Sequence, residues 1–73
     1  MKAEQQAQVL KYLKKRFGNE TVTASPRRVE DSIEIYMDDE FLGLLYIDDE
    51  DPNDISYNLD ITILQQDLDE MDA

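Results

Sequence analysis

The sequence contains neither cysteine nor histidine, and these two absences exclude several classes of protein. Without cysteine there is no disulfide framework, no cysteine-based zinc site and no thiol nucleophile. Without histidine the chain lacks the commonest metal ligand and the commonest general base. With only two glycines, it also has no Gly-rich loop to hold a phosphate. We therefore expect a protein that is not an enzyme, with no catalytic residues and no cofactor.

Long apolar stretches are also missing. The longest apolar run is residues 41–47, whereas a membrane-spanning helix needs about 20 residues. The first eight residues, MKAEQQAQ, are polar and lack the apolar core of a signal peptide. We therefore expect a cytoplasmic protein without membrane contact. The length of 73 residues fits one domain, 1–73, of modest stability.

Positive charge is absent from the second part of the chain. All seven lysines and arginines lie between Lys2 and Arg28, and sixteen of the eighteen acids follow them, which gives a net charge of −11. In one interpretation, folding brings the two parts together and the remaining charge serves solubility. In the other, an acidic face meets a basic protein partner. Because most of the surface would repel phosphate, we expect no direct nucleic-acid binding.

Residues 2–17 are expected to form an amphipathic helix. Apolar residues at spacings of three and four form one stripe, broadened by Val9 and Tyr12. The stripe consists of Ala3, Ala7, Leu10, Leu13 and Phe17. Three basic residues in the last turn favour the helix dipole, and Gly18 can adopt the positive φ that ends a helix.

Four segments with strand character follow, at about 20–24, 32–37, 41–47 and 55–63. The first is rich in β-branched residues and precedes Pro26, which favours an edge strand. The third is apolar on both faces, which is typical of a central strand covered on both sides. The fourth alternates strictly between apolar and polar residues, which predicts one buried face and one wet face.

The second and third segments are expected to form a hairpin through the acidic residues 38–40. A two-residue loop pairs Met37 with Glu40, and a three-residue loop pairs Met37 with Phe41. These registers turn opposite faces of the second strand inward, and the sequence leaves both open. Gly43 indicates a bulge or a close approach by another backbone, for which the N-terminal helix is the candidate.

The expected fold is α+β: an N-terminal amphipathic helix packed on a three- to four-stranded antiparallel β-meander. A short helical turn is expected over 64–71, where Leu64 and Leu68 are four residues apart. The acidic tail, residues 69–73, is expected to fray.

The acidic segment after the third strand is the sharpest candidate for a metal site. Asp49, Asp51, Asn53 and Asp60 occupy loop positions one, three, five and twelve, which echoes a calcium-binding EF-hand loop. However, position six is not glycine, position four is Pro52, and the flanks have strand character. A solvated loop is therefore the preferred interpretation, and a weak calcium or cation site is an alternative function.

Tyr36, Tyr46 and Tyr57 fall on three of the expected strands. Such residues most often pack across a sheet, but on one exposed face they would form a contact patch. We therefore predict a non-catalytic protein–protein interaction module. Its partner is an unidentified protein, for which a basic surface would be suitable, or a second copy joined by strand pairing. An acidic inhibitor that mimics nucleic acid is the remaining alternative.

Several short packing and turn motifs are distributed over nearly the whole chain. They are Phe17-Gly18-Asn19, Ile35-Tyr36, residues 39–43 (DEFLG), the acidic loop after Ile47, and residues 56–58 (SYN) leading into 60–64 (DITIL). This pattern resembles a family of short alphaproteobacterial proteins, domain-of-unknown-function family 3126. The resemblance implies a small bacterial cytoplasmic protein, and it brings no catalytic residue and no established activity. A glycine in the hairpin turn is typical of the pattern, and Asp38-Asp39 departs from it.

Overall fold

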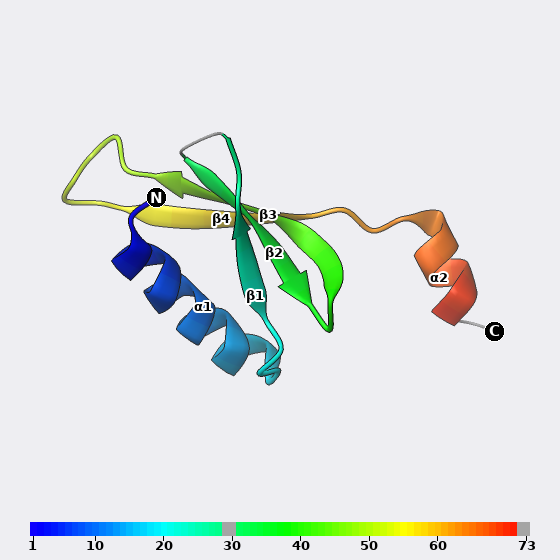
Figure 1. Ribbon diagram of the computed structural model, residues 1–73. Coiled ribbons are helices and arrows are strands. Elements are labelled where there is room, and N and C mark those ends of the chain that lie inside the picture. Colours follow the sequence, from blue (N-terminus) through cyan, green and yellow to red (C-terminus); the bar gives the residue numbers. More distant parts are fainter. Residues whose placement is uncertain (29–30, 72–73) are drawn as a thin grey trace.

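The computed structural model describes residues 1–28 and 31–71, and it contains one antiparallel sheet with a helix on one side (Figure 1). The elements in chain order are α1 (Ala3–Phe17), β1 (Thr23–Pro26), β2 (Ser32–Met37), β3 (Glu40–Asp48), β4 (Ser56–Ile61) and α2 (Gln65–Met71). The strand order β1-β2-β3-β4 is that of a simple meander. The predicted α+β fold and the antiparallel meander are therefore confirmed.

Helix α1 ends at the predicted position. Gly18 has a φ of 62°, and its N–H donates to the carbonyl oxygen of Lys15 at 3.3 Å. The N–H of Asn19 donates to the carbonyl oxygen of Lys14 at 3.0 Å. These two bonds form a Schellman motif, which satisfies two carbonyls that the helix itself leaves unpaired.

The buried side of α1 differs from the predicted stripe. Val9 and Leu13 are buried and Leu10 is half-buried. The predicted stripe residues that are exposed instead are Ala3, Ala7 and Phe17. An alanine buries little apolar area, so the longer side chains decide which side of the helix faces the sheet.

Strand β1 begins later than the sequence predicts. Residues 20–22 belong to the turn after α1, and Val22 enters the core with 1% of its surface exposed before the strand begins. The strand then continues to Pro26, which lies opposite Ile33. Proline is tolerated there because β1 is an edge strand, as predicted.

The hairpin between β2 and β3 closes with a two-residue turn. Met37 pairs with Glu40, and the two residues between them, Asp38 and Asp39, have φ values of 55° and 64°. Positive φ at both positions is what a type I′ turn requires, and aspartate tolerates this region better than most residues. The hairpin therefore forms its turn without glycine.

Further from the turn, the register changes by one residue. Tyr36 pairs with Phe41, but Ile35 pairs with Gly43, which leaves Leu42 as the extra residue of a β-bulge. The pairs beyond the bulge are those of the three-residue loop, so both registers that the sequence left open occur in one hairpin. The bulge allows the tight turn and an inward-facing Ile35 to coexist.

The backbone that approaches Gly43 belongs to β4, and the prediction that α1 approaches it is wrong. A Cβ atom at this position would overlap the carbonyl oxygen of Asp60 and lie 3.3 Å from the Cα of Ile61. Since Gly43 pairs with Ile61, the close approach lies within the sheet, directly after the bulge. The glycine allows β3 to bend there without losing its β4 partner.

The core lies between α1 and the first three strands. Its buried residues are Val9, Leu13, Val22, Ile33, Ile35 and Leu45. Within residues 1–28 and 31–71, no element covers the other face of β3: Phe41 is 53% exposed, and Leu44 and Tyr46 are half-buried. The prediction that this strand is covered on both sides is therefore wrong, although its central position in the sheet is confirmed.

The prediction that the fourth strand has one buried face is also wrong. Strand β4 is shorter than predicted, Ser56–Ile61, and on its α1 side Tyr57 is 36% exposed and Ile61 is 44% exposed. A helix is about 10–12 Å across, whereas four strands about 4.8 Å apart present a wider face. Because α1 packs against β1 (Figure 1), it covers β4 only in part, and Leu59 of β4 is half-buried against the core.

Helix α2 projects from the end of the sheet (Figure 1). Over residues 1–28 and 31–71, it packs against no other element. The predicted helical turn is confirmed as Gln65–Met71, so residues 69–71 are helical instead of frayed, and residues 72–73 lie outside the described part. The projecting helix makes the molecule elongated, with principal extents of 46 × 22 × 22 Å.

The loop after α1 is tied to the β2–β3 turn. The Asp38 N–H donates to the Thr21 hydroxyl at 2.8 Å, and the Asn19 side-chain amide donates to Asp38 Oδ2 at 3.2 Å. The Thr21 hydroxyl also lies 2.6 Å from Asn19 Oδ1 and 2.9 Å from Asp38 Oδ1, and it can donate to one of them. This junction holds the helix end against the hairpin.

Replacing Thr21 with valine should therefore lower the free energy of unfolding by about 1–2 kcal/mol, since valine keeps the shape and removes the hydroxyl. Thr23→Val is the matched control, because Thr23 is an exposed residue of β1 with no side-chain role at this junction. It should change stability by less than about 0.5 kcal/mol. Urea unfolding followed by circular dichroism measures both, and equal losses would contradict the proposed role of the hydroxyl.

Candidate interaction surface

The three tyrosines predicted as a contact patch do not share one face of the sheet. Tyr36 alternates with the buried Ile35, and Tyr46 alternates with the buried Leu45, so both lie on the face away from α1. Tyr57 lies on the α1 side, where it lines a groove with Val9 and Tyr12. The predicted patch is therefore divided between two faces.

Tyr36 is engaged with its neighbours on the face away from α1. Its hydroxyl donates to Glu34 Oε2 at 2.8 Å, and its ring meets the ring of Phe41 edge to face, with centroids 5.7 Å apart. The hydrogen bond to Glu34 raises the pKa of Tyr36 above its ordinary value of 10.0, and partial burial and the negative charge of Glu34 act in the same direction. This aromatic pair packs across strands, as facing aromatics commonly do.

The direction of the pKa shift of Tyr36 predicts how stability depends on pH. The folded chain holds the phenol proton more tightly than the unfolded chain, so this stabilisation is present below about pH 10 and is lost as pH rises through the raised pKa. The phenolate absorbance that Tyr36→Phe removes should develop above pH 10.0. Glu34→Ala should move that transition down, and an unchanged transition would show that Glu34 is not the cause.

An apolar groove separates α1 from the far side of the sheet. It has a volume of about 510 Å³. Its lining residues are Gln8, Val9, Tyr12, Leu13, Leu45, Tyr57 and Leu59. It exists because the sheet extends beyond the width of α1, which leaves Tyr57 of β4 exposed and Leu59 only half-buried.

Most of the exposed large apolar residues lie between residues 55 and 71, in a segment that begins at this groove with Tyr57 and Leu59 and continues beyond it. We call Tyr57, Leu59 and Ile61 the β4 surface, and residues 62–71 the C-terminal arm. In the arm, Ile63 is 68% exposed and Met71 is 73% exposed. The other large apolar side chains exposed between residues 55 and 71 are Ile55, Leu64 and Leu68. A cluster of this kind is typical of a surface that binds another molecule.

The two sides of this region carry opposite charges. On α1, Lys11, Lys15 and Arg16 are exposed, and the latter two line a hollow together with Tyr12 of the groove. The described part of the arm contains Asp67, Asp69 and Glu70 and no basic residue. A basic hollow thus adjoins the groove at Tyr12, and the arm contains an acidic helix with apolar residues.

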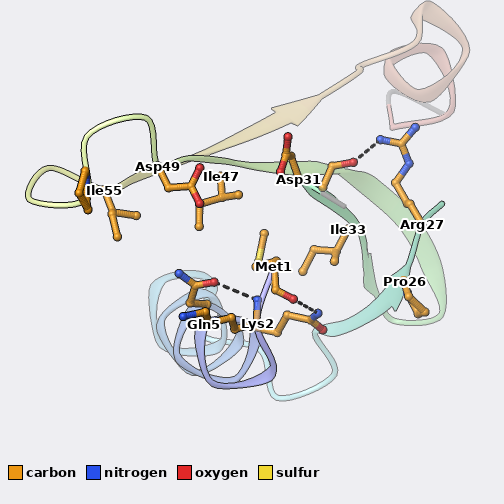
Figure 2. A pocket seen from close by; sticks show the side chains of 13 residues that line it. Met1, Lys2, Gln5, Pro26, Arg27, Asp31, Ile33, Ile47, Asp49 and Ile55 are labelled. Carbon is orange, nitrogen blue, oxygen red and sulfur yellow. Dashed lines mark hydrogen bonds between the residues drawn. The ribbon is translucent and has the colours of Figure 1, made fainter. Parts of the chain in front are cut away.

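A second, more polar groove lies at the N-terminal end of α1, with a volume of about 680 Å³ (Figure 2). Arg27 donates from Nη1 to the hydroxyl of the buried Ser32 at 2.6 Å, so its guanidinium has a structural partner. Lys2 lines the same groove, as do Asp31 and Asp49. Because both signs of charge are present, this groove favours no ligand of a particular charge.

The structure does not gather the candidate calcium ligands into an EF-hand loop. The carboxylate of Asp51 accepts the N–H of Asn53 at 2.9 Å, which is an Asx turn. Asp60 lies in β4 opposite Leu44, on the face away from α1, whereas Asp49 precedes the loop turn. Within residues 1–28 and 31–71, no group of three or more carboxylates is placed to hold a metal ion.

Comparison with protein families gives a match to the family described as protein of unknown function (DUF3126), over residues 5–67. The chain belongs to this family. For this DUF3126 protein, searches of curated proteins and of solved structures gave no match. In the part of the chain that the structure describes, neither helix is long and apolar enough to cross a membrane.

Of the DUF3126 surface described above, the sequence indicated only Tyr57. The sequence pattern predicts that Tyr12 belongs to the buried stripe of α1, yet Tyr12 is 62% exposed and lines the groove. The spacing of Leu64 and Leu68 predicts a helical turn and gives no sign that Leu68 is exposed. The sequence does contain one indication of this surface, which is that a single amphipathic helix accompanies four strands. One helix is too narrow to cover four strands, so part of the sheet stays uncovered whichever strand the helix lies on.

Proposed function

We propose that this protein is a cytoplasmic, non-catalytic interaction module that binds a protein chain through the β4 surface and the C-terminal arm. The observation that supports this best is the concentration of exposed apolar side chains between residues 55 and 71, together with the apolar groove that Tyr57 and Leu59 line. The acidic side of the arm suits a partner with basic residues around an apolar contact.

The opposite face of the sheet is a weaker candidate. There, one cross-strand row consists of Ser25, Glu34, Leu44 and Asp60, so polar and charged side chains interrupt the aromatic residues. A contact centred on that face would bury the carboxylates of Glu34 and Asp60.

Site-specific photo-crosslinking tests this proposal. A benzophenone amino acid is placed at position 61, on the β4 surface, or at position 60, which is the adjacent exposed residue on the other face. In an extract of the source organism, position 61 should give discrete protein adducts, and position 60 should give few. Equal labelling from the two positions, or none from position 61, would contradict the proposed surface.

A further inference from the structure

Helix α2 is too short to be stable without a packing partner. It has seven residues, and isolated helices shorter than about 12 residues are marginal in water. Leu64, Leu68 and Met71 are spaced by four and three residues and therefore lie along one side, with 55%, 41% and 73% of their surfaces exposed. The described chain offers no element that covers them.

The groove between α1 and β4 has the matching chemistry. Its lining is largely apolar, with the side chains of Tyr12 and Tyr57 exposed and that of Leu59 half-buried. The hollow that adjoins it at Tyr12 is basic at Lys15 and Arg16. An acidic helix with one apolar side is complementary to such a groove in both respects. This complementarity also offsets the repulsion between two chains that each carry a net charge of −11.

Strand β4 is an edge strand whose outer side is open to pairing. Native edges are commonly protected by proline or lysine, and Ser56–Ile61 (SYNLDI) contains neither. If two β4 strands pair antiparallel, the C-terminal end of each lies beside the N-terminal end of the other. Each arm then leaves its own sheet next to Tyr57 of the other copy, which lines the groove.

From these features we propose that the partner is a second copy of this chain, joined by antiparallel pairing of the two β4 strands, with each α2 seated in the α1–β4 groove of the other copy. This inference rests on the proposed function, since it names the partner of the same surface. The arrangement is isologous, because one two-fold axis relates the two copies and each groove then receives the arm of the other copy. It also accounts for the separation of the basic and acidic segments within the sequence.

Two single variants and their mixture test the exchange of arms. Leu68→Asp disables the arm and leaves the groove intact, whereas Tyr12→Asp disables the groove and leaves the arm intact. Both residues are exposed, at 41% and 62%, so each variant should fold, which circular dichroism can check. Gln66→Asp is the matched control, because it adds the same charge on the polar side of α2.

Sedimentation of the purified chain over a range of concentrations should give a dimer for the wild type and for Gln66→Asp. Each of the other two variants alone should weaken dimerisation by about 100-fold, because a charge is placed in an apolar contact. Mixing these two variants should restore much of the affinity, since the mixed dimer contains one intact groove facing one intact arm.

Three results would overturn the inference: a wild type that stays monomeric throughout, a dimer that neither Leu68→Asp nor Tyr12→Asp weakens, or a mixture that recovers nothing. The last would indicate that α2 folds onto its own chain. A monomeric wild type whose position 61 still crosslinks to a different protein would remove the second copy and leave the proposed function standing. Loss of both signals would remove both.

Discussion

Replacing Gly43 with alanine should lower the free energy of unfolding by about 3–5 kcal/mol, which is exceptional for one added methyl group. The new Cβ would overlap the carbonyl oxygen of Asp60 and lie 3.0 Å from its carbonyl carbon. Both are backbone atoms of β4, so no side-chain rotation relieves the overlap, and the two strands must move apart. A chain of this length has a total stability of roughly 4–11 kcal/mol, so a large share would be lost.

Gly18→Ala is the control for this prediction. Nothing lies within 4 Å of a Cβ atom at Gly18, and the only cost is that of holding alanine at a φ of 62°. That cost is about 1–2 kcal/mol. Chemical denaturation measures both variants, and amide hydrogen exchange should show the additional loss for Gly43→Ala in β3 and β4. A loss at Gly43 no larger than at Gly18 would contradict the close approach of β4.

Replacing Ile35 with alanine should cost about 3–5 kcal/mol, near the upper end for the loss of a buried aliphatic side chain. Ile35 has 0% of its surface exposed and is the largest fully buried side chain among the described residues. Its partners across the strands are Ala24 and Gly43, which have almost no side chain to move into the space left behind. The cavity would therefore stay open, and the cost of a cavity rises with the volume that remains.

Ile35→Val provides the graded comparison, because it removes one methylene and should cost about 0.5–1.5 kcal/mol. Urea unfolding at a single low protein concentration keeps any association constant between the variants. If alanine and valine give similar losses, the core around Ile35 can collapse, and the argument from its small neighbours is wrong.

Local signals in the sequence were sufficient for much of the fold. The end of α1 follows from Gly18 and the basic residues before it, since both act within one turn of the helix. The hairpin follows from apolar runs flanking Asp38 and Asp39. These features need only short-range chemistry, and the structure confirms them.

The features that the sequence did not determine depend on long-range packing. Residues 41–47 are apolar on both faces, so their pattern is compatible with either register and does not reveal the bulge at Leu42. Strand β1 begins after residues 20–22 because Thr21 is used at the junction with Asp38. Alternation in β4 correctly identified an apolar face, but whether another element covers that face depends on the position of α1.

The two edges of the sheet differ in a way that limits how large an assembly can become. Strand β1 has four residues and ends in Pro26, which lacks the N–H that an added strand would need. Growth by strand addition into a fibre requires two receptive edges on every chain, and here only β4 is receptive. Under the proposed β4 pairing, each chain would therefore form one contact of this kind, and edge pairing would end with two molecules.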